Sequence, residues 1–334
     1  MKALQSIIAV SVLFSSAPLF AQDAKLIEAA KKEGGKIVAY GSLEGDTTEA
    51  VRKAFEQKTG LTLEYWRAST TKVVDRATSE YRAKKGLVDV ILVHDAEMHH
   101  LFKENVVARY DSPRFTEFTK ESIDPQLGPR YRDTIIGIVY NKSVVKPEDT
   151  PKSLDDLLKP QFRGKLVMPD PTQHTTTTEW VASLNKVMPP ERAEKFIRDL
   201  AASKPLLVES LLPAAERVST GEAAVAVTYI KFTYIYGQKG APLDYMRSDK
   251  MLGEGSYIMS AAKPPHPNGA KAFIDFFLRD QSMKILAQNG EFVTRKGVHP
   301  PIAGADKIKF IEMIHLDQNG FAAKTKEYQK IFLQ

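Results

Sequence analysis

Polar side chains follow three short apolar runs in the first third of the chain. The runs are 36–40, 61–66 and 88–93, and the polar residues after them are Ser42 and Glu44, then Arg67, Ser69 and Thr70, then His94. A carboxylate and an imidazole, as in Glu44 and His94, are both ligands that suit a transition metal. The guanidinium and hydroxyls of the middle group are donors suited to an anion. These residues therefore predict a site for a metal or for an anion.

A second polar group lies near the middle of the chain. The segment 170–180 reads "DPTQHTTTTEW" and places four side chains at an expected helix start: Thr172, His174, Thr175 and Thr176. Unpaired backbone N–H groups and hydroxyls at a helix N-terminus favour a bound carboxylate or phosphate. Thr175 is equally well explained as an ordinary N-cap. Lys231 adds positive charge from a later segment. An anion pocket is thus at least as well supported as a metal pocket.

The elements that would hold these residues alternate between strand and helix. The three apolar runs predict strands, and helical spacing predicts helices over 47–59 and 71–85. A second series begins at 165–168, with a helix near 175, strands at 206–208 and 223–228 and a helix at 214–220. A strand at 256–261 and a long helix over 268–288 follow. This alternation predicts an α/β fold with parallel sheets, whose ligands bind at the carboxyl ends of the strands.

Composition excludes several classes of protein. Hydrophobic residues make up 43% and charged residues 26% of the 334, the balance of a globular chain. The net charge of +6 is spread among alternating acidic and basic residues, so we expect no nucleic-acid partner. There is no cysteine, which excludes disulfides, thiolate metal sites and a lipid-modified cysteine anchor. Because nucleophile, HExxH and phosphate-loop motifs are also absent, we expect neither an enzyme nor a catalytic cofactor.

The first 21 residues are typical of a secretory signal. Lys2 precedes an apolar stretch over 7–14, and Ala17, Pro18 and Ala21 come before a polar restart. The apolar stretch is short for a membrane span. Cleavage after Ala21 would release a periplasmic protein. The alternative is a buried N-terminal helix.

Five stretches of the chain carry a resemblance to a known family. They are "KIVAYGSLEGDTTEAVRKAFEQKTG" from Lys36, "VDVILVHD" from Val88, "FRGKLVMPDPT" from Phe162, "STGEAAVAVTY" from Ser219 and "PNGAKAFIDFFLRDQSMKILAQNGEF" from Pro267. With them the chain resembles the type II periplasmic binding proteins of ABC importers, most of all the ferric-iron-binding branch. The resemblance implies a two-lobed α/β fold with a central cleft and crossover hinge strands near 135–140 and 256–261.

The resemblance also implies a domain division and a set of partners. After a signal peptide over 1–21, lobe 1 comprises 22–134 and 262–334, and lobe 2 comprises 135–261. The protein would be a monomer that captures a small molecule or metal in the cleft and delivers it to an inner-membrane ABC permease. Lobe closure on the ligand would be a hinge motion.

This chain differs from the iron-binding relatives at the positions that hold their metal. They use a histidine on the first loop and a glutamate after the third strand, whereas here Glu44 and His94 occupy those places with the types exchanged. They also use two adjacent tyrosines, whereas Tyr229, Tyr234 and Tyr236 are separated here. Tyr229, just beyond a strand, is the best placed, although Tyr234 or Tyr236 could replace it.

Two ligand hypotheses remain from this comparison. The first is ferric iron, with or without an accompanying anion, held by Glu44, His94 and Tyr229. The second is an organic anion: a carboxylate, phosphonate or phosphorylated compound. The alternative for the two loop residues is that Glu44 is solvated and His94 caps the following helix. The overall resemblance favours iron, and the separated tyrosines favour the anion. Ferric iron is the predicted ligand, and the organic anion is the alternative.

Overall fold

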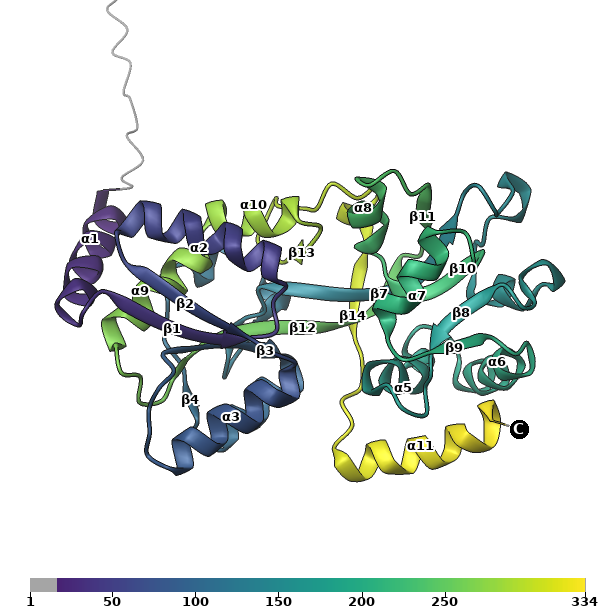
Figure 1. Ribbon diagram of the computed structural model, residues 1–334, viewed down its shortest axis with the longest axis horizontal. Coiled ribbons are helices and arrows are strands. Elements are labelled where there is room, and N and C mark those ends of the chain that lie inside the picture. The colour runs from purple at the N-terminus through teal and green to yellow at the C-terminus, as the bar shows by residue number, and fades with distance from the viewer. Residues whose placement is uncertain (1–16, 334) are drawn as a thin grey trace, which may run out of the picture.

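Two lobes lie side by side and are joined by long strands across the middle of the molecule (Figure 1). The structure is a computed structural model that describes the backbone of residues 17–333 and the side chains of 23–317 and 319–333. Residues 1–16, which hold most of the predicted signal peptide, lie outside the described residues. The predicted two-lobed α/β class is confirmed.

Lobe 1 is built on the predicted parallel β-α-β-α-β series. Strands β1 (Lys36–Gly41), β2 (Thr62–Arg67) and β3 (Val90–His94) pair in parallel in the order β2-β1-β3. Helices α1 (Ala17–Lys32), α2 (Gly45–Thr59), α3 (Thr70–Arg82) and α4 (Asp95–Lys103) connect and cover them, and the short strands β4 (Val107–Ala108), β5 (Ile123–Asp124) and β6 (Gly128–Pro129) follow. Gly60 ends α2 in a left-handed conformation with φ 68°, which glycine adopts at least cost.

The predicted long helix over 268–288 is two helices in the structure. Helix α9 (Pro267–Phe277) ends before Arg279, which is extended and precedes α10 (Asp280–Gln288). The expected buried aromatics are in place, because Phe273 and Phe276 contact Phe55 of α2 edge-on with centroids 5.3 and 5.2 Å apart. These helices therefore close the lobe 1 core.

Lobe 2 repeats the α/β pattern on a second part of the sheet. Its strands are β8 (Leu166–Pro169), β9 (Leu206–Val208), β10 (Val225–Tyr229) and β11 (Leu243–Tyr245). Its helices are α5 (Thr175–Ala182), α6 (Pro190–Ala202), α7 (Leu211–Ser219) and α8 (Phe232–Gly237). Strand β8 pairs in parallel with both β9 and β10. The carboxyl ends of these strands therefore share one edge, as in lobe 1.

Two crossover strands connect the lobes. Strands β7 (Arg132–Asn141) and β12 (Lys250–Ala261) run antiparallel, with Gly253 opposite Ile135 and Ser256 opposite Arg132. Both are longer than the predicted crossovers. A Cβ on Gly253 would lie 2.5 Å from the Thr134 carbonyl oxygen, so a side chain at this position would force the two strands apart.

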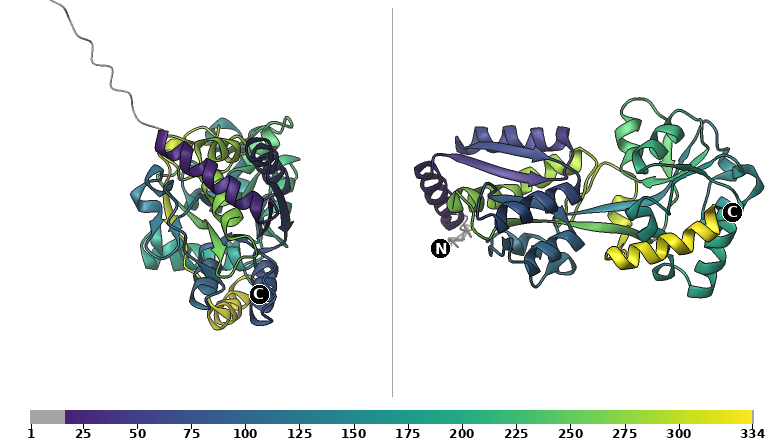
Figure 2. Two further views of the ribbon diagram at one scale, coloured as in Figure 1. Left: turned by 90° about the vertical axis from the view of Figure 1, so that its left-hand side faces the viewer. Right: turned by 60° about the horizontal axis from the view of Figure 1, so that its bottom comes forward.

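The C-terminal part of the chain runs from lobe 1 along the crossover strands to lobe 2. Strand β13 (Phe292–Val293) pairs with β7, β14 (Lys309–Glu312) pairs with β12, and α11 (Gln318–Phe332) contacts α5 and α6 of lobe 2. Met313 and Tyr328 are buried in the lobe 2 core. Helices α9 and α10 contact α2 of lobe 1. The chain then crosses back, so helices α1 and α11 lie on different lobes (Figure 2, right).

The described N-terminal segment is tied to lobe 1. Asp23 is almost fully buried, accepts hydrogen bonds from Arg114 at 2.9 and 3.1 Å, and is also paired with Arg279. These contacts begin two residues after the predicted cleavage position. Among the helices of residues 17–333, none combines the length and apolar character needed to cross a bilayer.

Candidate ligand-binding site

A group of four charged side chains joins the two lobes beside the crossover strands. Glu44 comes from lobe 1, Lys231 from the start of α8 in lobe 2, Arg132 from β7 and Glu291 from the turn before β13. Glu44 accepts from Lys231 Nζ at 2.5 Å and from Arg132 Nη1 at 3.1 Å. Glu291 lies 3.0 Å from Lys231 Nζ and 2.8 Å from Arg132 Nη1. We call these four residues the hinge cluster.

Burial differs sharply within the hinge cluster. The side chains of Arg132, Lys231 and Glu291 are 3%, 5% and 2% exposed, whereas Glu44 is 44% exposed. Glu44 precedes α2 in an extended conformation, and its side chain does not cap that helix. Its carboxylate is thus available to the space between the lobes. Glu44 is the one member of the cluster whose own side chain is not buried.

The hinge cluster holds its charges in the ionised form. Burial alone would raise the pKa of the Glu44 carboxyl, but Lys231 and Arg132 hold it well below its usual range. Burial likewise disfavours the Lys231 ammonium, yet the carboxylates of Glu291 and Glu44 raise its pKa. Two cations therefore face two carboxylates, and the cluster is electrically balanced.

His94 lies next to the hinge cluster on the same face of the crossover strands. Its Nδ1 is 3.0 Å from the Ser256 hydroxyl, and Ser256 also lies 3.4 Å from Arg132 Nε. The side chain of His94 does not cap the following helix, because it makes no hydrogen bond to the start of α4. Burial, with Arg132 acting in the same direction, lowers the pKa of His94 to about 4. The imidazole is therefore neutral at neutral pH.

Tyr229 completes the set of predicted metal donors. It ends β10, and Lys231 Nζ lies 5.7 Å from the centroid of its ring. Burial raises the pKa of Tyr229 well above its usual value, and the carboxyls of Glu254 and Glu44 add to the effect. The phenol therefore stays protonated and can donate a hydrogen bond. Glu44, His94, Tyr229 and Lys231, which the sequence singled out, are thus brought together.

Most of the predicted helix-start residues in lobe 2 are engaged locally. Thr172 bonds through its hydroxyl and its backbone N–H to Asp170, at 2.7 and 2.8 Å. His174 caps α5, since its Nδ1 accepts from Thr177 N at 3.3 Å, and burial lowers its pKa. Thr175 is exposed. The structure therefore leaves Thr175 and Thr176 as the residues of this segment available to a ligand.

Thr176 adjoins a buried carboxyl on β12. Glu254 is 6% exposed, its Oε2 lies 3.8 Å from His94 Nδ1, and its Oε1 has no hydrogen-bond partner among the described residues. Burial raises the pKa of Glu254 to about 8, with Glu179 and Glu97 acting in the same direction and the Thr176 hydroxyl opposing them. At neutral pH Glu254 is mostly a neutral acid, able to donate as well as accept.

The remaining predicted residues lie farther from the crossover strands. Arg67 and Ser69 are exposed and Thr70 is half-buried at the end of β2, which is the outer strand of the lobe 1 sheet. Ser42 is half-buried, and its backbone N–H bonds to the Leu92 carbonyl at 3.2 Å. The sequence placed all three strand-end loops at one edge, but the strand order puts the β2 loop outermost.

The family of this chain follows from comparison with known proteins. A family model for bacterial extracellular solute-binding proteins matches residues 85–319, more than two thirds of the chain. The chain belongs to this family. As a bacterial extracellular solute-binding protein, it binds its ligand without converting it.

Solved structures share the fold of this solute-binding protein at low sequence identity. Iron-bound HitA from Pseudomonas aeruginosa is 22% identical, with a TM-score of 0.68 over 89% of this chain and 98% of that one. AfuA from Actinobacillus pleuropneumoniae, with exogenous fructose-6-phosphate bound, is 18% identical, with a TM-score of 0.68 over 89% and 96%. The substrate-binding protein of an Agrobacterium tumefaciens ABC transporter is 13% identical, with a TM-score of 0.74 over 89% and 94%.

The match to a curated relative covers a smaller share of this chain than the matches to the solved structures do. An uncharacterized protein of Haemophilus influenzae is 22% identical over 147 residues, which are 43% of this chain and 42% of that protein. The match therefore spans less than half of either chain. The descriptions of the solved structures name different ligands. Structural similarity therefore establishes the fold of this chain, and the ligand has to be inferred from the residues of the site.

Sequence reasoning missed four residues of this candidate site. They are Arg132, Glu254, Ser256 and Glu291, of which Arg132, Glu254 and Ser256 lie on the crossover strands. The predicted crossover near 135–140 excluded Arg132. Glu254 precedes the predicted 256–261 strand. The sequence signal that could have identified Arg132 and Glu254 is a charged residue next to an apolar run.

A second polar cluster joins the lobes on a neighbouring part of β12. His315, which follows β14, places its Nε2 3.3 Å from Asp95 Oδ2 and 3.3 Å from Glu312 Oε1. We call these three residues the acidic cluster. One donor atom from each lies within 4.8 Å of the others, an arrangement that could hold a divalent metal ion. Burial opposes the imidazolium, but Asp95 and Glu312 raise the pKa of His315 to about 10.

Proposed function

We propose that this solute-binding protein captures a small organic anion in the cleft at the hinge cluster. The ligand class is a carboxylate, a phosphonate or a phosphorylated compound. The observation that carries the proposal is that Glu44 is held by two buried cations, Lys231 at 2.5 Å and Arg132 at 3.1 Å. A half-exposed carboxylate on two buried cations occupies a place that the acidic group of a ligand can take.

Charge balance supports this exchange. Lys231 and Arg132 are almost fully buried, and uncompensated buried charge is strongly unfavourable. Glu291 is also buried and supplies one negative charge. A ligand that displaced Glu44 would have to bring a negative group of its own, because otherwise a net positive charge would be left. Neutral solutes therefore cannot replace Glu44 without a large loss of electrostatic energy.

Neutral donors around the cluster add hydrogen bonds for such a ligand. The Tyr229 phenol and the His94 imidazole are uncharged at neutral pH. Thr176, on α5 of lobe 2, contributes a hydroxyl. Hydrogen bonds to an ionised acceptor are about twice as strong as those between neutral groups. Donors from both lobes would favour the closed form when the anion is present.

Ferric iron is the second candidate, because Glu44, His94 and Tyr229 do converge. The metal would have to displace Lys231 and Arg132 from Glu44 while two cations remained nearby. Like charges a few ångströms apart repel strongly where water is excluded. The metal would also have to ionise the Tyr229 phenol, whose pKa is raised. These costs make the anion the better-supported ligand.

Calorimetry and visible absorption distinguish the two ligands. Purified protein should release heat on titration with members of a panel of carboxylates, phosphonates and sugar phosphates, and native mass spectrometry of protein from its own periplasm should show the natural ligand. Ferric nitrilotriacetate should produce no visible charge-transfer band. A purple or orange band that disappears in Tyr229→Phe, with no response to any anion, would reverse the assignment.

Export and the division into lobes belong to the same proposal. A signal peptide over 1–21 would be removed to release the periplasmic form. Lobe 1 would comprise residues 22–134 with α9 and α10, and lobe 2 residues 135–261 with α11. Intact-mass measurement of the periplasmic protein should match a chain that begins at Gln22. A mass that retains the first 21 residues would contradict the cleavage.

A further inference from the structure

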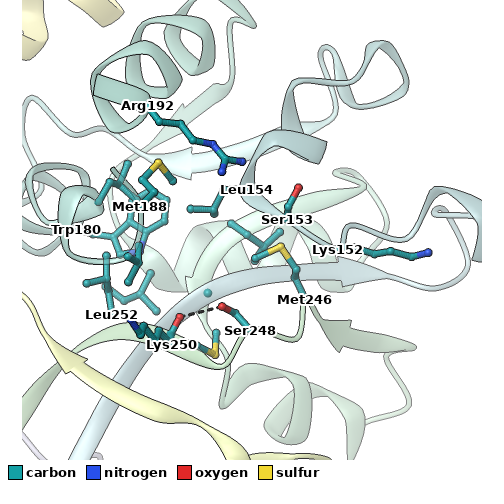
Figure 3. Close-up of a pocket in the computed structure, with 16 residues that line it drawn as sticks. Lys152, Ser153, Leu154, Trp180, Met188, Arg192, Met246, Ser248, Lys250 and Leu252 are labelled. Atoms are coloured by element: carbon teal, nitrogen blue, oxygen red, sulfur yellow. Dashed lines mark hydrogen bonds between the residues drawn. The ribbon is translucent and has the colours of Figure 1, made fainter. Parts of the chain in front are cut away.

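A cavity of about 220 Å³ opens in lobe 2, away from the hinge cluster. It lies between the crossover strands and helices α5 and α6, and Figure 3 shows the side chains around it. We call it the lobe 2 cavity. Its lining includes Trp180 of α5, Arg192 of α6, Ile136 and Ile138 of β7, and Met251 of β12. None of the candidate residues of the cleft lines it.

The floor of the lobe 2 cavity is apolar. Its buried members are Ile136, Ile138, Trp180, Leu184, Met246, Met251 and Leu252, each at most 5% exposed. Half-buried Leu154 and Met188 continue the same surface. Methionine side chains are flexible and polarisable, so they adapt to ligands of different shape. The floor therefore suits a ring or a short hydrocarbon chain.

The rim of the lobe 2 cavity is positively charged. Lys152, Arg192 and Lys250 are exposed lining residues, and no Asp or Glu is among the lining residues. Arg192 is paired with Asp155, whereas Lys152 and Lys250 form no ion pair within residues 23–317. The Arg192 guanidinium points over the cavity above Leu154, and Lys152 points away from it (Figure 3). An anionic group above the apolar floor would meet Arg192 first.

We propose that the lobe 2 cavity is a second ligand site, for a small amphipathic carboxylate. The apolar part would contact Trp180 and the methionines, and the carboxylate would pair with Arg192 in the field of Lys250. A cavity of about 150 Å³ lined by apolar side chains accepts benzene. The larger lobe 2 cavity therefore has room for an aromatic ring with a short acidic arm. This site is independent of the ligand in the cleft.

The two tryptophans of the chain allow a direct test. Trp66→Phe keeps the aromatic contact with Tyr40 and leaves Trp180 as the single fluorophore. In this background phenylacetate should change the Trp180 emission saturably. Phenylacetamide, its neutral isostere, should bind about tenfold more weakly, since it lacks the charge-assisted hydrogen bond. Equal affinity for the two compounds, or no response to phenylacetate, would overturn the proposal.

Matched arginine variants locate the carboxylate. Arg192→Gln should weaken phenylacetate binding about tenfold. Arg198→Gln is the control, because Arg198 lies on the same helix, is 68% exposed and also makes one ion pair, but does not line the cavity. Equal affinities of the two variants would exclude Arg192 from the site and overturn the proposal.

Methionine NMR separates the lobe 2 cavity from the cleft. Three of the nine methionines line the cavity: Met188, Met246 and Met251. Their labelled methyl resonances should shift with phenylacetate, and the shifts should be the same in Glu44→Gln. Shifts confined to other methionines, or shifts that change with Glu44→Gln, would place the compound in the cleft and contradict the second site.

Discussion

The hinge cluster and the acidic cluster both link the lobes, but they differ in the ratio of cations to carboxylates. In the hinge cluster two cations, Lys231 and Arg132, meet two carboxylates. In the acidic cluster one imidazole, His315, lies between Asp95 and Glu312. Buried Glu179 adds to the negative surroundings of His315. The first cluster is balanced, and the second has an excess of carboxyls.

The chemistry of the cations makes the two links respond differently to pH. Arginine and a lysine paired with two carboxylates stay charged across the physiological range. The charge on His315 depends on its carboxylate neighbours, because an isolated histidine is mostly neutral above about pH 6.5. The segment that carries His315 is fixed to lobe 2, since Leu316 N donates to Glu179 at 2.8 Å. One interlobe link therefore keeps its charges as the pH changes, whereas the other can be titrated.

Removing a cation of the hinge cluster should have the largest effect. In Lys231→Met the carboxylate of Glu291, buried with Arg132 as its remaining partner, loses a charge 3.0 Å away. Breaking a buried ion pair from one side costs about 3–5 kcal/mol, and urea denaturation should show a loss of unfolding free energy in that range. Lys239→Met, at an exposed lysine, is the control. A loss no larger than in the control would mean that the cluster is not a structural unit.

His315→Asn should have a smaller effect that depends on pH. The folded pKa of His315 is raised to about 10, above the value of about 6.5 expected in the unfolded chain. The stabilisation from its charge is thus fully present below about pH 6.5 and is lost as pH rises towards 10. The difference in unfolding free energy between wild type and variant should shrink between pH 6.5 and 10. A difference that stays constant over this range would show that His315 acts without its charge.

Much of the fold could be predicted because local patterns determine it. Apolar runs separated by helical spacing gave the strands of both lobes. The carboxyl ends of parallel strands then placed Glu44 and His94 near each other, and the family resemblance added Tyr229. The position of α11 could not be predicted in this way, because its contacts with α5 and α6 join segments more than a hundred residues apart.

The site could be predicted only in part, and for a related reason. Arg132 and Glu291 are buried by partners distant in the sequence, such as Glu44, which is 88 positions from Arg132. Nothing in a local window distinguishes such an arginine from a solvated one. His174 and Thr172 were predicted as ligand contacts, but short-range bonds to Thr177 and Asp170 engage their side chains. Polar side chains at a helix start form local hydrogen bonds with nearby residues, which leaves fewer of them to contact a ligand.

Glu44→Gln tests whether the half-exposed member of the hinge cluster is a stand-in for the ligand. Removing its charge leaves Lys231 and Arg132 with Glu291 alone, so the affinity for an anion should rise by several-fold. Calorimetry with the anion identified from the panel would measure it. Glu49→Gln, at a partly exposed glutamate on α2, is the matched control. Weaker anion binding in Glu44→Gln would show instead that the carboxylate contacts the ligand directly.

Arg67→Gln should have the smallest effect. Arg67 is exposed at the end of the outermost strand of lobe 1, whereas Arg132 and Lys231 are buried beside the crossover strands. A surface charge of this kind changes stability by less than about 0.5 kcal/mol. Its contribution to anion binding is a long-range attraction that salt screens within about 8 Å. The affinity of Arg67→Gln should therefore fall less than about threefold in physiological salt, and the difference should vanish as salt is raised. A tenfold loss that persists in high salt would mean that lobe closure brings Arg67 onto the ligand, as its place after a strand first predicted.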